Sequence, residues 1–183
     1  LWAAWLWLRD TPALGIGLWL LTAGPLGVVM ACGYIALLKK IVLPRMQPGI
    51  YPVHSPLYLR KWLSDGIMRM SRAVLLPLYT TLYLPPYLRM LGAKIGARAE
   101  ISSIWYMAPE LTDIAEESFF ADGSIIGGKR FFRGRFEVGR NRIGRRSFVG
   151  NSAILPTGTG LGDRCLLGVN SIPPVTPGAS GES

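Results

Sequence analysis

Eight basic side chains gather in a short stretch late in the chain. Residues 129 to 146 hold eight Lys and Arg in 18 residues, opposed only by Glu137. The basic residues are Lys129, Arg130, Arg133, Arg135, Arg140, Arg142, Arg145 and Arg146. Because a guanidinium group matches the oxygens of a phosphate, one interpretation is an anion-binding loop. The other is an ordinary solvated surface.

Two residues have side chains suited to proton transfer. His54 is the one histidine of the sequence and a candidate general base, with an ordinary loop residue as the alternative. Asp122 follows three apolar residues and precedes Gly123. Burial would raise its pKa toward that of a useful base, whereas Asp before Gly is also typical of a turn. Cys32 and Cys165 are too few and too distant for a zinc site, so we expect no metal.

An uncharged segment near the start of the sequence predicts a transmembrane helix. The net charge is +9 and 50% of the residues are apolar, a composition that excludes a disordered chain. Residues 13 to 38 are 26 residues without a charge, and about 20 are enough to cross the hydrocarbon core. A cleaved signal peptide has a shorter apolar core. Because Lys39, Lys40 and Arg45 follow this segment, we expect its carboxyl-terminal end to face the cytoplasm.

A second apolar stretch, from Ala73 to Leu88, is too short and too interrupted to cross a membrane. Pro77 and the pair Pro85-Pro86 lack a backbone N–H and break a helix. We expect an irregular helix that lies on the bilayer surface or against the following domain. Residues 39–92 are therefore predicted to form a cytoplasmic or interfacial helical connector.

A repeat of six residues is the most specific pattern in the sequence. Five consecutive units begin at Ile143, Val149, Leu155, Leu161 and Leu167. The first position is always a branched aliphatic residue, the second is Gly or Pro, and the fifth is small. Gly or Pro permits a corner between short strands, the small residue fits inside it, and the aliphatic side chain fills the interior. The pattern predicts a mainly β fold, a left-handed parallel β-helix with these five side chains inside.

The same register extends upstream with two interruptions. Residues in register recur at Ile95, Ile101, Ile114, Phe120, Ile126 and Val138. The β-helix is therefore predicted to cover residues 95–174. Trp105–Thr112 and Gly127–Glu137 do not fit the period, and we expect protruding loops there, where binding sites usually lie.

Residues 18 apart in the repeat should stack on one outer face. Phe148 is predicted to lie over Leu166, Ile154 over Ile172, and Arg146 over Arg164. The apolar pairs need a cover, either the Ala73–Leu88 stretch or a second subunit in a homo-oligomer. The two arginines should repel unless an anion or a carboxylate lies between them.

Aromatic residues near the basic stretch would suit binding to nucleic acid. A membrane-tethered β-helix is a poor scaffold for that function, so we expect no nucleic-acid partner.

Several segments together resemble a known family. They are the uncharged helix, Tyr58–Trp62, Leu91–Gly96, Ser118–Gly123, Arg133-Gly134 and Phe148–Asn151. From about residue 13 to Pro174 the chain resembles the carboxyl-terminal region of the poly-ε-lysine synthetases, which are membrane-bound nonribosomal peptide synthetases. Unlike common hexapeptide acyltransferases, the predicted coil contains no histidine base.

The resemblance implies an acyltransferase-like domain that forms amide bonds by transferring an aminoacyl group from a carrier-domain thioester to an amine. His54 or Asp122 would act as the base, and backbone amides near Asn151 would donate to the thioester oxyanion. The implied partners are membrane lipid, an adenylation domain, and a carrier domain with its phosphopantetheine arm. The implied location is a bacterial inner membrane, with the β-helix facing the cytoplasm.

Two other functions stay open, a non-catalytic scaffold that docks the carrier domain and a stand-alone membrane acetyltransferase that uses acetyl-CoA. In each case the residues expected to bind substrate or carrier are Lys129, Arg130, Arg133, Arg135, Arg145, Arg146 and Asn151. Residues 1–10 are interpreted as the end of a preceding apolar segment, and residues 175–183 as a linker or truncated tail.

Overall fold

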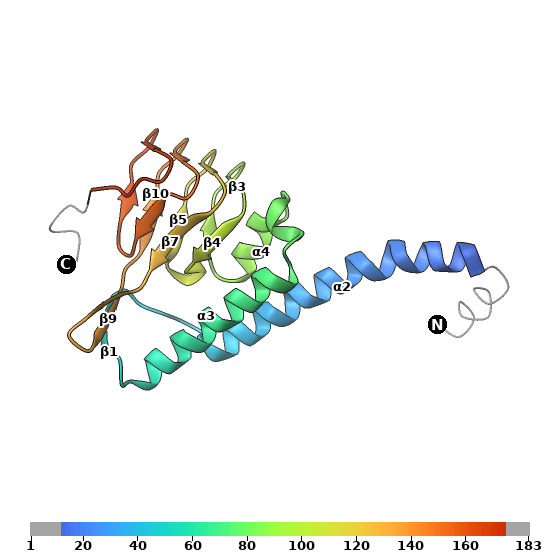
Figure 1. The fold of residues 1–183 in the computed structure, drawn as a ribbon, viewed down its shortest axis with the longest axis horizontal. Coiled ribbons are helices and arrows are strands. Elements are labelled where there is room, and N and C mark those ends of the chain that lie inside the picture. The colour runs from blue at the N-terminus through green and yellow to red at the C-terminus, as the bar shows by residue number, and fades with distance from the viewer. Residues whose placement is uncertain (1–11, 175–183) are drawn as a thin grey trace.

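Helices precede a stack of short parallel strands. The computed structural model describes residues 12–174 (Figure 1), so the predictions for residues 1–10 and 175–183 lie outside the described residues. Two long helices, α2 (Pro12–Val42) and α3 (Pro56–Val74), are joined through the short strand β1 (Gly49–Pro52). The short helices η1 (Leu78–Thr80) and α4 (Leu84–Met90) then lead into the strands.

The strands form three parallel sheets that the chain visits in turn. The first contains β2 (Lys94–Ile95), β5 (Thr112–Ile114), β10 (Asn141–Ile143) and β13 (Gly160–Leu161). The second contains β3 (Glu100–Ile101), β6 (Phe119–Phe120), β11 (Phe148–Val149) and β14 (Leu166–Leu167). The third contains β4 (Ile104–Met107), β7 (Ser124–Gly128) and β12 (Ile154–Pro156). Each passage through the sheets is called a coil below, and the coils lie side by side in Figure 1.

The predicted inward column is confirmed. Val149 and Leu155 are fully buried, Ile143 and Leu167 are at most 7% exposed, and Leu161 in the last coil is half-buried. The upstream residues in register, Ile95, Ile101, Ile114, Phe120 and Ile126, belong to the same core. This apolar interior excludes water and supplies the main favourable free energy of the coil.

The outer stacking also follows the repeat. Phe148 pairs with Leu166 across neighbouring strands, as the spacing of 18 residues predicts. The rings of Phe119 and Phe148 stack with their centroids 5.5 Å apart. Leu166 is nevertheless 75% exposed. The Ala73–Leu88 stretch therefore does not cover this face, and a homo-oligomer through it stays a prediction.

Corners of the coil depend on two features at different positions of the repeat. A Cβ atom at Gly144 would lie 2.4 Å from the carbonyl carbon of Gly162, so neighbouring coils approach too closely for any side chain there. The left-handed backbone falls two residues later, at Arg146, Ser152, Arg164 and Asn170, with φ between 53° and 56°. Glycine is thus needed for close approach, while non-glycine residues adopt the conformation that glycine normally supplies.

The two interruptions of the repeat are ordered elements rather than protruding loops, which corrects the sequence-based expectation. Residues 104–107 form β4, and η2 (Pro109–Leu111) follows it. After β7, the strands β8 (Arg130–Phe132) and β9 (Arg135–Val138) form an antiparallel hairpin that also pairs with β1. Phe136 is fully buried, with the rings of Tyr51 and Tyr58 centred 5.7 and 5.3 Å from its own. This aromatic packing holds the hairpin against the helical part.

The Ala73–Leu88 stretch packs against the coil, one of the two places expected for it. Pro85 and Pro86 lie in the first turn of α4, where a missing N–H costs nothing, so they begin a helix instead of breaking one. Leu84 and Leu88 are buried, and α4 contacts β2 and β3 of the first coil. Leu82 and Tyr83 remain exposed, and their contact with a bilayer stays a prediction.

The long helices expose apolar surface. Within residues 12–174, α2 is the one helix long and apolar enough to cross a membrane, over Ile16–Val42. Its second half packs on α3. In α3 the usual burial pattern of a helix from a soluble protein is reversed, with polar side chains inside and apolar ones outside. The polar residues Lys61, Ser64, Asp65 and Ser71 of α3 are buried, whereas Leu59, Trp62, Met70 and Val74 are exposed. Both surfaces are consistent with membrane association.

We expect the interior of the coil to tolerate truncation poorly. Leu155→Ala removes a fully buried side chain and should lower the free energy of unfolding by about 2–5 kcal/mol, because a cavity is left behind. Leu166→Ala, at an exposed position of the neighbouring sheet, is the matched control and should change it by less than about 0.5 kcal/mol. Denaturant unfolding of both variants measures this, and equal losses would contradict the inward column.

Candidate functional site at the basic hairpin

The basic hairpin presents two exposed arginines at its tip. Arg133 and Gly134 join β8 to β9 with φ values of 45° and 71°, as in the two-residue turns that suit the twist of a hairpin. Arg133 and Arg135 are exposed and form no ion pair with any residue between 12 and 174. The hairpin therefore keeps two guanidinium groups free for an external anion.

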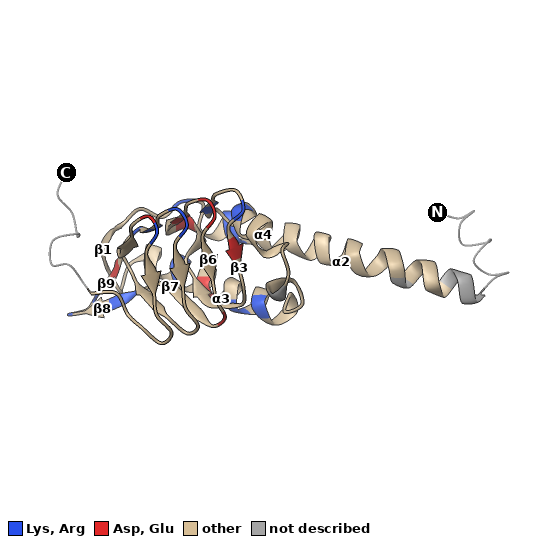
Figure 2. Ribbon diagram, turned by 90° about the horizontal axis from the view of Figure 1, so that it is seen from above, with Lys and Arg blue, Asp and Glu red and all other residues tan. Residues whose placement is uncertain are grey.

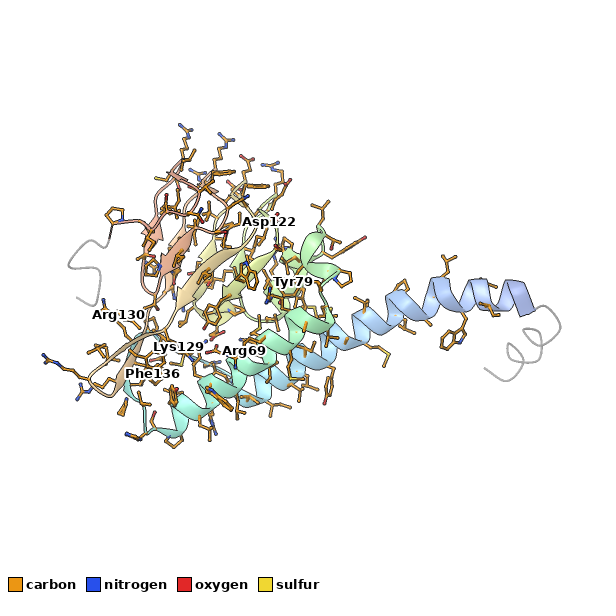
Figure 3. All side chains as sticks on the ribbon, in the orientation of Figure 1. Arg69, Tyr79, Asp122, Lys129, Arg130 and Phe136 are labelled. Atoms are coloured by element: carbon orange, nitrogen blue, oxygen red, sulfur yellow. The ribbon has the colours of Figure 1, made fainter. Side chains whose placement is uncertain are left out.

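The other two predicted cations of this segment already have partners. Arg130 pairs with Glu137 at 2.6 Å. Lys129 is mostly buried, and its ammonium lies 2.5 Å from Asp65 in α3. Figure 3 shows Lys129 between the hairpin and this helix. Lys129 therefore links the hairpin to α3, while Arg130 links β8 to β9, and both are less available for carrier binding than the sequence implied.

His54 lies beside the hairpin tip. It is exposed in the turn between β1 and α3, and the backbone N–H of its neighbour Val53 donates to the carbonyl of Gly134 at 3.0 Å. Ser55 begins α3 by accepting from the N–H of Tyr58, which fixes the end of this turn. The structure thus brings the predicted base close to the two free arginines.

Asp122 and Asn151 lie at a different corner. The N–H of Ser152 donates to the carbonyl of Asp122 at 2.8 Å, so the two predicted residues occupy neighbouring coils at one position. In Figure 3 Asp122 is well separated from Lys129 and Arg130, and the β1–α3 turn with His54 lies on the opposite side of the coil in Figure 1. The structure therefore does not combine Asp122 or Asn151 with His54.

Of the two interpretations of Asp122, the structure supports the turn before Gly123 rather than a buried base. Its side chain is exposed, and its carboxylate accepts hydrogen bonds from the hydroxyl of Ser102 and from the N–H and hydroxyl of Ser103. The bond from Ser102, with those from Ser103, lowers the pKa of Asp122 below its ordinary value. Asp122 is a structural corner residue in this arrangement and a poor proton acceptor.

Arg145 and Arg146 belong to a third location, a ridge of corners between the first and second sheets. Arg146 lies 2.5 Å from Glu117, and Arg145 lies 3.5 Å from Asp163. Figure 2 shows acidic and basic residues next to one another along this ridge. Glu117 offsets the charge of Arg146, whereas Arg164 forms no ion pair within residues 12–174, so the repulsion between these two arginines stays a prediction. The basic stretch of the sequence is therefore not one continuous surface.

A buried ion network, which no local sequence pattern indicates, joins the helices to the coil. The carboxylate of Glu110 in η2 pairs with Lys61 at 2.6 Å and with Lys39 at 2.7 Å. Asp65 pairs with Lys61 at 3.0 Å and with Lys129. Lys61 is 1% exposed. Three positive and two negative side chains from α2, α3, η2 and the start of the hairpin are thus paired largely away from water.

Pairing within the network fixes the charge states. Burial alone would raise the pKa of Glu110, but Lys61 and Lys39 outweigh it and lower that pKa to about 2. Burial would lower the pKa of Lys61, but Glu110 and Asp65 raise it above its ordinary value. Burial also raises the pKa of Tyr106, whose hydroxyl donates to Asp65 at 3.1 Å. The pKa shifts of Glu110, Lys61 and Tyr106 all move away from neutral pH, so we interpret the network as structural.

Replacing Glu110 by Gln should destabilise the protein strongly. Lys39 and Lys61 would keep buried charges without their shared anion, which typically costs about 3–5 kcal/mol. Because the pKa of Glu110 is lowered from 4.5 to about 2, its contribution is present above about pH 4.5 and is lost as the pH falls toward 2. Thermal unfolding at several pH values measures both effects.

Glu100→Gln is the control for this change, since Glu100 is exposed and its replacement should leave the unfolding midpoint almost unchanged. An unfolding midpoint of Glu110→Gln equal to that of the unmodified protein would show that the network does not hold the two parts together.

Comparison with known proteins shows that the chain is similar to part of a synthetase. No family model matches it, and no solved structure matches it. The delta-poly-L-ornithine synthetase of Acinetobacter baumannii (strain AB307-0294) is 44% identical over 137 residues, which are 75% of this chain and 10% of that protein. The chain thus spans about a tenth of the length of the curated relative that it matches. Over three quarters of its length, the chain is thus similar to a short segment of that synthetase.

Proposed function

We propose that the chain is an acyltransferase-like domain of a membrane-bound nonribosomal peptide synthetase, which forms amide bonds from a carrier-bound aminoacyl thioester. The observation that carries this proposal is the 44% identity to a delta-poly-L-ornithine synthetase. The match to a short segment of a much longer synthetase favours a domain of a larger chain over a stand-alone acetyltransferase that uses acetyl-CoA. The six-residue repeat and the stacked parallel sheets support a left-handed β-helix of the hexapeptide type as its fold.

In this proposal the hairpin tip receives the carrier domain. Arg133 and Arg135 contact carboxylates on the surface of the carrier domain, since free guanidinium groups pair well with carboxylate oxygens. His54 lies beside them and accepts a proton from the attacking amine. The C–N bond forms as the C–S bond of the thioester breaks, and the proton held by His54 passes to the departing thiolate. Asn151 lies at another corner and has no part in this step.

The membrane orientation is part of the same proposal. Lys40 in the last turn of α2 and Arg45 after the helix are exposed, whereas Lys39 is paired in the buried network. Two exposed cations at this end support a cytoplasmic location for it, because positive charge is in excess on that side of membrane proteins. The coil would then face the cytoplasm at a bacterial inner membrane, where a carrier domain can reach it.

His54→Gln tests catalysis by this domain. In the protein that carries this chain, loss of the base should lower amide-forming turnover by about 100-fold or more, with the affinity for the carrier unchanged. Asp122→Asn alters an exposed carboxylate at a distant corner and should leave turnover unchanged. Steady-state transfer from a loaded carrier domain measures both variants. Full turnover with His54→Gln would remove the histidine from the mechanism.

A second candidate function, a non-catalytic scaffold that docks the carrier domain, has its own support. Asp122 has a lowered pKa, and His54 lies on an exposed turn rather than in a closed site. Catalytic acids and bases are commonly found where water is excluded. Normal turnover in the His54→Gln variant, combined with weaker carrier binding in hairpin variants, would favour this scaffold.

We expect the hairpin tip to contribute to carrier binding through charge. The double variant Arg133→Gln with Arg135→Gln should weaken binding of the carrier domain, and the loss should shrink as salt rises, because exposed charges are screened over about 8 Å at physiological ionic strength. Each contact is worth only about 0.2–1 kcal/mol, so the pair should be changed together.

Arg145→Gln with Arg146→Gln is the matched control for the hairpin variant. It removes the same charge from the ridge of corners, where both arginines already pair with carboxylates. Titration of the carrier domain at low and high salt compares the two. Equal losses in both double variants would indicate a general effect of net charge and would contradict a docking role for the hairpin.

A further inference from the structure

A cavity lies where α2 ends against the turn from α4 to β2. Its volume is about 460 Å³. Four basic residues line it, namely Lys39, Lys40, Arg45 and Arg140, together with one acidic residue, Glu110. Neither the resemblance nor the hairpin site uses this cavity.

The charges around the cavity do not cancel. Glu110 is already balanced by Lys61 and Lys39, and Arg140 pairs with Asp113 at 3.1 Å. Lys40 and Arg45 are exposed and form no ion pair within residues 12–174. The cavity therefore has an excess of positive charge with two cations available at its mouth.

Lys39 supplies a further donor from a buried position. Its ammonium group donates to the carbonyl of Leu91 at 3.1 Å and to Glu110 at 2.7 Å. An ammonium group has three donors, so one N–H remains for a third acceptor. Because Lys39 is 3% exposed, a ligand oxygen that meets this N–H would do so out of bulk water, where such a contact is stronger.

One wall of the cavity is apolar. Ala36 of α2 and Leu43, which directly follows this helix, line it, with Met90 from the end of α4. Met90 is 57% exposed, and Leu37 and Ile41 of α2 are also exposed close by in the sequence. An extended, uncharged tail can therefore lie along this wall while an anionic group meets the basic residues.

We propose that this cavity binds a phosphate group that is attached to an uncharged, extended tail. Lys40, Arg45 and the free N–H of Lys39 contact the phosphate, and the wall formed by α2 and Met90 contacts the tail. Two ligands share this chemistry, an anionic phospholipid whose chains follow α2 and the phosphopantetheine arm of a carrier. The inference does not rest on the proposed function, because a lipid would bind here whatever the domain catalyses.

Binding to the purified protein in neutral detergent tests the inference, with dioctanoyl phosphatidylglycerol and 4′-phosphopantetheine as separate probes. We expect saturable binding of at least one probe, and an affinity about tenfold lower for Lys40→Gln with Arg45→Gln. Arg133→Gln with Arg135→Gln at the hairpin is the control and should retain this binding. Native mass spectrometry reports whether phospholipid stays bound after purification and whether the same cavity variant loses it.

The outcomes separate the two sources. Stronger binding of the phosphatidylglycerol probe, lost in the cavity variant, assigns the cavity to lipid. Stronger binding of 4′-phosphopantetheine with the same loss assigns it to the carrier arm. Binding of neither probe, or equal affinity in the unmodified protein and the cavity variant, overturns the inference. A carrier domain that depends only on the hairpin would leave the proposed function standing in that case.

Discussion

The pairing of Lys61 with Glu110 is the interaction on which the rest of the arrangement depends. Lys61 is on α3 and Glu110 is on η2, in the first interruption of the repeat. Taking both charges out of water costs several kcal/mol, which is offset only when the partners and their hydrogen bonds are all present. Helix and coil must therefore meet in one relative position. Lys39 and Lys129 extend this constraint to α2 and to the hairpin.

The same network explains why α3 has its polar face inside. A helix at the surface of a soluble domain normally buries its apolar stripe, but Lys61 and Asp65 must point toward Glu110 and Lys129. Leu59 and Trp62 are then left on the outer face. Because α2 also exposes apolar side chains, the part of the molecule fixed by the network presents an apolar surface on one side and the hairpin tip with His54 on another. The network thus positions the candidate site without taking part in its chemistry.

Sequence reasoning succeeded where a single period governs the structure. The column from Ile143 to Leu167 and the stacking of Phe148 on Leu166 follow directly from a repeat of six residues. The hairpin interrupts that period, and an interrupted period does not by itself distinguish a hairpin from a loop. The presence of a charged residue in the sequence also does not show whether its side chain is available to an external ligand or already paired within the protein. Lys129 and Arg146 both look available until their partners Asp65 and Glu117 are brought beside them.

The ion network was out of reach of local patterns, because Lys39, Lys61 and Glu110 are far apart in the sequence and meet only in the folded chain. A double-mutant cycle of Lys61→Met and Glu110→Gln, measured by equilibrium unfolding, tests its role most directly. We expect the double variant to be more stable than the sum of the single losses predicts, by about 2 kcal/mol, since each single change leaves a buried charge behind. Additive losses, within about 0.5 kcal/mol, would show that the two side chains do not interact and would contradict the network as the link between helices and coil.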